Sequence, residues 1–271
     1  MTMRFKILGS SSSGNAALLI TDNCKVLIDA GFTARRLGQL LEECGESIDT
    51  IDAVFLTHEH SDHSSGIRGL SHFPEMKIFA NHATAKVLQD TLKRRINWKL
   101  FETGTTFQYR DLKIDTFVVP HDACDPVGFV IHNIPGSTNQ TSNSIGWVLD
   151  LGYVPQLVRE RVRGVDLLVV EANYDTHLLD NDTKRPWSVK QRIKGRHGHL
   201  SNEAVYTFLN EMDNIKWRDV YLAHLSKDCN SKVLLNNMFS PQNGFLKKFS
   251  VNIVDPEKSL FPTHDLQNRL E

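Results

Sequence analysis

The chain has 271 residues, and 31 lysines and arginines against 32 aspartates and glutamates give a formal net charge of −1. A content of 40% hydrophobic and 23% charged residues is typical of a soluble globular protein and excludes a disordered or collagen-like chain, while the near-neutral charge argues against a globally basic nucleic-acid binder. No apolar run approaches the roughly 18 residues of a membrane-spanning helix and no signal peptide is recognisable, so we expect no membrane association.

Short strands separated by Gly, Ser and Asn turns open the chain, and we expect them at residues 4–8, 16–20 and 25–29. Thr33 is a typical N-cap for a helix that runs to about Glu43, since leucines recur on one face and Gly45 follows the last turn. Residues 51–56 are predicted to form a buried strand whose carboxyl end leads into a run of histidines.

Strands and helices continue to alternate along the rest of the chain. We predict strands at residues 77–80, 112–119, 127–132, 145–149, 166–170, 219–223 and 249–254. We predict helices near residues 82–93, 155–162, 201–212 and 229–239. Because no change in composition marks a linker, we expect one α/β domain over residues 1–255, followed by a loosely held tail at residues 256–271.

The four cysteines are scattered along the chain and form no CxxC pair. Isolated thiols in a chain of this size indicate a reducing compartment, so we expect the protein in the cytoplasm. No segment points to an obligate protein partner.

The segment from residue 57 to residue 63 (THEHSDH) carries the strongest chemical signal in the sequence. His58 and His60 are two positions apart at a strand end, so both imidazoles can point the same way, and Asp62 and His63 follow where the chain turns. Burying these groups is costly unless something pairs with them, and imidazole with carboxylate suits Zn, Mn or Fe. A solvated polar loop is the alternative, but the preceding apolar strand favours a buried metal site.

A site for two metals needs more ligands than this segment offers. His121, Asp150 and His224 each follow an apolar strand, which is where α/β sheets usually place their chemistry. Taken singly, each would more commonly be a hydrogen-bonded core or loop residue. Together with residues 58–63, they favour a metal centre built at the strand ends.

This HxHxDH segment followed in order by His121, Asp150 and His224 resembles the five motifs of the metallo-β-lactamase superfamily over nearly the whole chain. The resemblance implies an α/β fold, a four-layer αβ/βα sandwich with two divalent metal ions at one edge of the two sheets. It implies that one metal is held by His58, His60 and His121. It implies that the other is held by Asp62, His63 and His224, with Asp150 bridging the two ions.

Further residues resemble the nuclease branch of that superfamily, which includes tRNase Z and RNase J. Glu171 and His199 look like the acidic–histidine pair that supplies a proton donor there, and His224-Leu225-Ser226 looks like its last ligand motif. The runs at residues 8–15 and 198–202, with Asn230, are most similar to the YycJ/WalJ group of bacterial proteins, which resemble double-strand DNA 5′→3′ exonucleases. One departure is Cys229, which stands where a second asparagine is expected beside Asn230.

Two segments could contact a nucleic-acid substrate. The turn at residues 9–15, with Ser12 and Asn15, either cradles a phosphate through backbone N–H groups or is a plain hairpin turn. The run from 184 to 196 contains six basic and no acidic residues, so it is either a solvated helix face or a phosphate-binding segment beside His199. The substrate-binding residues that we expect are Ser12, Asn15, Lys194, Arg196, Ser226 and Asn230.

These residues favour metal-dependent hydrolysis of a phosphodiester, with DNA a more probable substrate than RNA. We expect water acidified between two metals to attack, Asp62 to orient that water, and His199, held in one tautomer by Glu171, to protonate the leaving 3′ oxygen. A thioester or lactone hydrolase resembling glyoxalase II is the alternative, but it gives Glu171 and His199 no role. A non-catalytic metal-binding regulatory protein is a third possibility, disfavoured because every expected ligand is present. N/O ligands leave Zn, Mn and Fe open.

Overall fold

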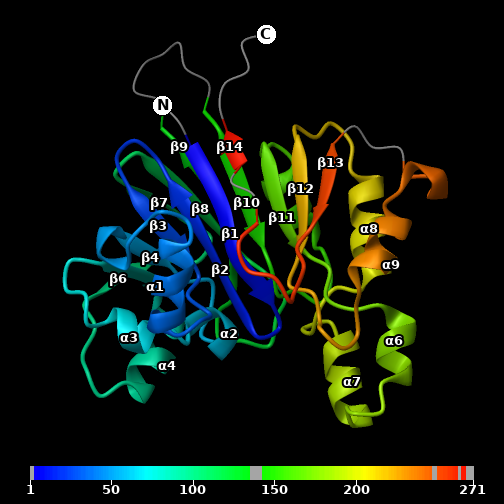
Figure 1. Cartoon of the computed structure of the whole chain (residues 1–271), viewed down its shortest axis with the longest axis horizontal. Coiled ribbons are helices and arrows are strands. Elements are labelled where there is room, and N and C mark those ends of the chain that lie inside the picture. The colour runs from blue at the N-terminus through cyan, green and yellow to red at the C-terminus, as the bar shows by residue number, and fades with distance from the viewer. Residues whose placement is uncertain (1–2, 135–141, 246–248, 262–263, 267–271) are drawn as a thin grey trace.

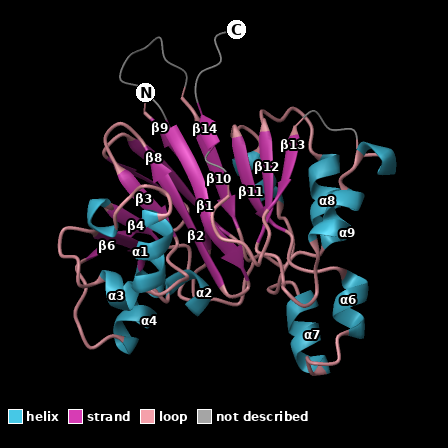
Figure 2. Ribbon diagram, viewed as in Figure 1, coloured by secondary structure: helices cyan, strands magenta, loops and turns pink. Residues whose placement is uncertain are grey.

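Two mixed β-sheets pack face to face at the centre of the molecule, and helices cover their outer faces (Figure 1 and Figure 2). The computed structural model describes residues 3–134, 142–245, 249–261 and 264–266. The layers run helix, sheet, sheet, helix, so the predicted four-layer αβ/βα sandwich is confirmed. Every helix among the described residues is too short or too polar to span a lipid bilayer.

The first sheet has seven strands in the order β14-β1-β2-β3-β4-β5-β6. Pairing is antiparallel from β14 to β3 and parallel from β3 to β6. Its strands are β1 (Met3–Ser11), β2 (Gly14–Ile20), β3 (Lys25–Ile28), β4 (Ala53–Phe55), β5 (Lys77–Asn81), β6 (Trp98–Phe101) and β14 (His264–Leu266). The helices of this half are α1 (Ala34–Glu42), α2 (Ser61–Ser64), α3 (Ile67–Leu70) and α4 (His82–Thr91), with a 3₁₀ turn at Ile48–Thr50.

The second sheet also has seven strands, in the order β13-β12-β11-β10-β9-β8-β7. Pairing is antiparallel from β7 to β10 and parallel from β10 to β13. Its strands are β7 (Thr106–Tyr109), β8 (Leu112–Val118), β9 (Val127–Asn133), β10 (Ser144–Val148), β11 (Leu167–Glu171), β12 (Asp219–Ala223) and β13 (Ser250–Ile253). The helices of this half are α5 (Gln156–Val162), α6 (Thr176–Asn181), α7 (Trp187–Lys194), α8 (Asn202–Glu211) and α9 (Lys232–Met238), with a 3₁₀ turn at Pro241–Asn243.

Three apolar layers hold the sandwich together. Between the sheets, Phe5 packs edge-on against Trp147, and Phe55 packs in the same way against Phe129. The other two layers lie between each sheet and its own helices. Because both faces of each sheet are covered, strands such as β2, β10 and β11 are buried along their whole length, as is typical of α/β sheets.

Most of the predicted elements are confirmed, with ends that differ by a few residues. Sequence reasoning missed two partly exposed strands, β6 and β7: β6 has no regular alternation, and β7 alternates over only four residues. It also missed the helix pair α6–α7, which extends beyond the sandwich (Figure 1). In the segment predicted as a tail, β14 pairs with β1 and Leu266 is buried; residues 262–263 and 267–271 lie outside the described residues.

The topology brings several carboxyl ends of strands to one edge of the sandwich. Strands β3 and β4 run parallel in the first sheet, and β8, β10, β11 and β12 share one direction in the second. The residues that follow these strands therefore meet at one edge, where chemistry is commonly placed in α/β proteins.

Candidate metal centre

Three residues at this edge have left-handed backbone conformations. Asp29 follows β3, Asp150 follows β10 and His224 follows β12, with φ angles of 60°, 54° and 57°. Non-glycine residues rarely adopt such angles, and local strain of this kind gathers at functional sites. The unusual backbone turns each side chain sharply off its strand end.

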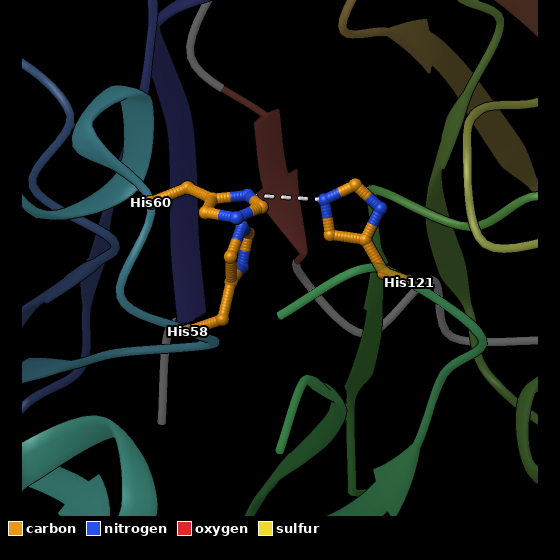
Figure 3. Close-up of side chains that lie close together, drawn as sticks. All are labelled: His58, His60 and His121. Atoms are coloured by element: carbon orange, nitrogen blue, oxygen red, sulfur yellow. Dashed lines mark hydrogen bonds between the residues drawn. The ribbon is translucent and has the colours of Figure 1, made fainter. Parts of the chain in front are cut away.

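His58, His60 and His121 form the first group of converging side chains (Figure 3). His60 Nδ1 lies 3.1 Å from His121 Nε2, and the ring centroids of His58 and His60 are 4.8 Å apart. Burial, reinforced by the nearby His63, holds the pKa of His58 well below its usual value. His58 is therefore neutral, and a neutral imidazole has the free lone pair that a metal ligand needs.

Asp62, His63, Asp150 and His224 form the second group, with one ligand atom of each lying within 4.8 Å of the others. Asp150 Oδ2 is 2.6 Å from His63 Nε2, and Asp62 Oδ2 is 3.2 Å from His224 Nε2. Burial raises the pKa of Asp150, but His224 and His63 outweigh it, so the carboxylate stays ionised. Asp150 also lies 3.9 Å from both His58 Nε2 and His121 Nε2, which places it between the two groups.

The chemistry of these donors fits divalent cations. Among the described residues, His58 Nε2 is a buried atom without a hydrogen-bond partner, and leaving such an atom unsatisfied is costly. Burial opposes a charge on His63, but Asp150 and Asp29 outweigh it and raise its pKa to about 10. The same negative field would attract a cation. Imidazole nitrogens and carboxylate oxygens in this arrangement could hold Zn, Mn or Fe.

Asp29 is a contributor to this centre that sequence reasoning missed. Its Oδ2 accepts from Nδ1–H of His63 at 2.8 Å and from the indole N–H of Trp147 at 3.1 Å. Its Oδ1 accepts from the backbone N–H and the hydroxyl of Thr57, both at 2.9 Å. The Asp29 contact directs Nε2 of His63 toward the second group, as carboxylates commonly do for metal-binding histidines. The signal was available, because Asp29 ends an apolar strand as Asp150 does.

Glu171 and His199, singled out from the sequence as a pair, are in contact. His199 Nδ1 lies 2.7 Å from Glu171 Oε1, and His224 Nδ1 lies 2.9 Å from the same oxygen. Glu171 Oε2 accepts from the backbone N–H groups of Leu151 and Leu200. Burial opposes a charge on His199, but Glu171, with help from Asp150, raises its pKa well above the usual value. One buried carboxylate therefore orients two histidines of the site.

A pocket of about 440 Å³ opens over this centre. Side chains of both groups of candidate ligands line one part of it, together with Ser12 and His199, while α7 contributes Val189, Arg192 and Ile193. His199 is partly exposed, at 22% of its side chain. The pocket therefore joins the candidate metal ligands to a histidine that can reach a bound molecule.

The structure separates the expected substrate-binding residues at 12 and 15. Ser12 is exposed and lines the pocket. Asn15 is fully buried, and its side-chain amide lies within hydrogen-bond distance of the carbonyl oxygens of Ser11 and Asp62 and of His63 Nε2. Asn15 is thus placed to hold the segment at residues 58–63 in position through Asp62 and His63.

Ser226 and Asn230 are also buried rather than open to the pocket. The Ser226 hydroxyl accepts from the backbone N–H of Cys229. Asn230 and Asn202 exchange two side-chain hydrogen bonds, at 3.0 and 2.8 Å, and Asn230 also donates to the carbonyl of Ala172. These contacts fix the loop that carries His224.

The predicted basic run reaches the pocket at a residue that sequence reasoning did not single out. Lys194 pairs with Asp180, and Arg196 stacks over the ring of Tyr153 at 4.4 Å from its centroid. Neither lines the pocket, whereas Arg192 does. The available signal was the spacing of Val189, Arg192 and Ile193, since positions three and four apart share one face of a helix.

Comparison with known proteins agrees with this arrangement. Residues 25–225 match the family model described as the beta-lactamase superfamily domain. Exodeoxyribonuclease WalJ of Streptococcus pneumoniae is 33% identical over 240 residues, covering 85% of this chain and 84% of WalJ. Exodeoxyribonuclease YycJ of Bacillus anthracis is 28% identical over 264 residues, covering 95% of this chain and 97% of YycJ.

Solved structures give the same fold. The metallo-β-lactamase fold protein YhfI of Bacillus subtilis matches with a TM-score of 0.72 and 17% identity, over 98% of this chain and 100% of YhfI. At that identity the likeness concerns the fold alone. The family match and the WalJ similarity span most of the sequence, and the expected histidines and aspartates converge at one edge. The chain therefore belongs to the metallo-β-lactamase superfamily, in its YycJ/WalJ group, and is a metal-dependent hydrolase.

Proposed function

We propose that the protein is a nuclease that hydrolyses phosphodiester bonds of DNA, progressing from a 5′ end. The observation that carries this proposal is the contact between His199 and Glu171, because a histidine oriented in this way can act as a proton donor beside the candidate metal ligands. Asp150 Oδ1 lies 3.2 Å from the same nitrogen of His199 that Glu171 contacts. The exodeoxyribonuclease names of the YycJ and WalJ relatives support DNA as the substrate.

We further propose that two divalent ions bind, one at His58, His60 and His121 and the other at Asp62, His63 and His224, with Asp150 between them. Zn or Mn suits these donors, and Fe fits them equally well. When bound, such ions supply positive charge for the phosphate oxygens and acidify water.

The protein side chains then complete the reaction. Asp62 is half-buried beside His224 and lines the pocket, where it can orient the attacking water and accept its proton. As the water oxygen bonds to phosphorus, the bond from phosphorus to the 3′ oxygen breaks. His199 donates the Nε2 proton to that departing oxygen, while Glu171 keeps the Nδ1–H in place. General-acid help of this kind typically accelerates a reaction about 10²–10⁴-fold.

The competing function is hydrolysis of a small thioester or lactone. It uses the same metal ligands but assigns no role to the Glu171–His199 contact. The two functions differ in their response to salt, since contacts with a phosphate backbone release counterions and weaken steeply as salt is added. A compact ester carries no such backbone.

The deciding experiment incubates the protein with Mn or Zn and with labelled single- or double-stranded DNA or RNA carrying a 5′-phosphate or a 5′-hydroxyl. We expect a DNA strand to be shortened progressively from its 5′ end, and the rate to fall as NaCl is raised. Internal cuts from the earliest times would contradict the exonuclease assignment. Hydrolysis of a thioester with no nucleic acid degraded would contradict the proposed function as a whole.

A further inference from the structure

Helix α7 forms one wall of the pocket and contributes a positive charge to it, that of Arg192. Among the described residues that line the pocket, Arg192 is the one lysine or arginine, and it faces a site built from histidines and carboxylates. Its side chain is 66% exposed, yet it reaches across to Asp122, the residue next to His121. Because so exposed a side chain could extend into solvent, packing alone does not explain why the guanidinium lies at the pocket.

The segment that carries Arg192 is firmly joined to the metal centre. Nδ1–H of His121 donates to the carbonyl of Gly198 at 3.1 Å. A Cβ at Gly198 would overlap the carbonyl oxygens of Ile193 and Arg192, and a Cβ at Gly152 would overlap the backbone of Arg196. These close approaches leave α7 little freedom to move relative to His121. Arg192 is thus held on a fixed support.

The face of α7 that carries Lys190 and Lys194 is anchored as well. The buried Lys190 donates from Nζ to the carbonyl of Asp180 at 2.8 Å, and Lys194 pairs with the carboxylate of the same residue. Both contacts tie α7 to α6. The neighbouring cations of the basic run are therefore engaged within the helix pair, and Arg192 is the one directed to the pocket.

The contact with Asp122 uses only one edge of the guanidinium. Arg192 donates from Nε to Asp122 Oδ2, and Asp122 Oδ1 lies 3.4 Å from His121 Nε2. A guanidinium has five N–H donors in a planar fork, so the two Nη groups can still bind the oxygens of an anion. Arginine is well suited to phosphate because this fork binds two oxygens at once. Asp122 thus holds the guanidinium at a set angle to the metal centre.

We propose that Arg192 binds a phosphate of the nucleic-acid strand adjacent to the phosphate being cleaved, and that Asp122 positions the guanidinium for this contact. The inference rests on the proposed function, because a neighbouring phosphate exists only in a polynucleotide. Metal ions held by the histidines and aspartates would neutralise one phosphate. The next phosphate along the strand requires a cation outside that centre, and Arg192 supplies it.

The test compares Arg192→Ala, Arg192→Lys and Asp122→Asn with the wild-type protein. Each is assayed in Mn²⁺ with a short 5′-phosphorylated DNA duplex at several NaCl concentrations, and with bis(p-nitrophenyl) phosphate, a diester without a neighbouring phosphate. Arg161→Ala is the matched control, because it removes the same charge from the exposed face of α5, away from the pocket. Thermal melting and metal content establish that each variant is folded and loaded.

We expect Arg192→Ala to raise KM for DNA about 10–100-fold, the usual effect of losing a charge-assisted hydrogen bond, with little change in kcat. The slope of log(1/KM) against log[NaCl] should become shallower by about 0.9, one phosphate contact. Arg192→Lys should recover part of the loss, because an ammonium keeps the charge but not the fork. Hydrolysis of the small diester should match that of the wild-type protein.

The Asp122→Asn variant distinguishes phosphate binding by Arg192 from a role in which Arg192 only neutralises Asp122. It keeps a side-chain oxygen for Nε but loses the charge that holds the guanidinium in place, so KM for DNA should rise, by less than in Arg192→Ala. If Arg192 served only to neutralise Asp122, the double variant Asp122→Asn/Arg192→Ala would bind DNA normally, and that result would overturn the inference.

Two further results are decisive and distinguishable. A wild-type protein that degrades DNA, with Arg192→Ala indistinguishable from Arg161→Ala in KM and salt slope, sinks the inference and leaves the proposed function intact. A wild-type protein that cleaves bis(p-nitrophenyl) phosphate but no nucleic acid sinks the proposed function, and the inference with it.

Discussion

Two buried carboxylates support the metal centre from opposite sheets, Asp29 at the end of β3 and Glu171 at the end of β11. Both are fully buried and both accept hydrogen bonds on each oxygen. Asp29 directs one histidine, His63, and its other donors come from Thr57 and Trp147. The first sheet therefore offers a carboxylate that contacts one candidate ligand directly.

Glu171 differs because a single oxygen serves two histidines with different tasks. His224 lies among the candidate metal ligands, whereas His199 is partly exposed at the pocket. On the mechanism that we propose, the second sheet couples ligand orientation to proton transfer through one carboxylate, while the first sheet orients a ligand alone. Substitutions at the two carboxylates should therefore impair different properties of the protein.

Glu171→Gln should have the largest effect, because it disturbs both histidines at once. We expect kcat for DNA to fall by at least the loss of a general acid, about 10²–10⁴-fold, and metal affinity to fall roughly 10–100-fold. Steady-state kinetics and metal content after dialysis measure the two effects separately. If Glu171→Gln kept normal metal content and normal kcat, the idea that Glu171 serves two histidines with different tasks would be wrong.

His199→Ala isolates the proton-transfer part of the Glu171 contact. The expected drop in kcat is about 10²–10⁴-fold, with metal content unchanged, because His224 keeps its own contact with Glu171. His177→Ala, an exposed histidine on α6, is the matched control. Turnover of His199→Ala at the rate of the control would show that His199 is not the proton donor.

Asp29→Asn should have a smaller effect of another kind. The amide oxygen can still accept from Nδ1–H of His63, but the charge that strengthens this contact is lost, so we expect metal affinity to fall about 10–100-fold. At saturating metal, kcat should recover to near the wild-type value. Isothermal titration with the metal and kinetics across metal concentrations check this, and a loss of kcat that added metal does not restore would contradict it.

The smallest effect concerns the pH dependence of stability after metal removal. Burial opposes charge on His63 and His224, but the carboxylates around each histidine, Asp150 first among them, together outweigh it and raise both pKa values from 6.5 to about 10. Stability from these groups is therefore complete below about pH 6.5 and lost as pH rises through about 10. Thermal melting in a chelator should show a falling Tm across that window. Protein reloaded with metal should show a weaker dependence, because the Nε2 atoms that face the metal would then hold no proton.

The sequence predicted most of the centre because its signals are local. Residues 58–63 are contiguous, and His121, Asp150 and His224 each end an apolar strand, so a rule about strand ends is enough to collect them. The same rule applies to Asp29, but a lone aspartate after a strand is common, and nothing in the sequence reveals the left-handed turn that points it at His63. Orientation of this kind depends on tertiary contacts.

The substrate-binding expectations were harder to place for two physical reasons. Motif resemblance does not separate a residue that touches substrate from one that holds a loop, and Asn15, Ser226 and Asn230 are buried in loop-holding contacts. Within the basic run, the choice between Arg192 and Lys194 depends on the rotational phase of α7, and that helix was not predicted. An error of two residues turns a side chain by more than half a helical turn.

The left-handed residues Asp29, Asp150 and His224 also limit how this protein can be engineered for heat resistance. Replacing a strained non-glycine residue by glycine is a standard way to relieve a backbone cost of about 1–3 kcal/mol. Here that exchange would delete a side chain of the metal centre at each of the three positions. Thermostable versions will have to gain their stability elsewhere, in the apolar layers or on the outer helices.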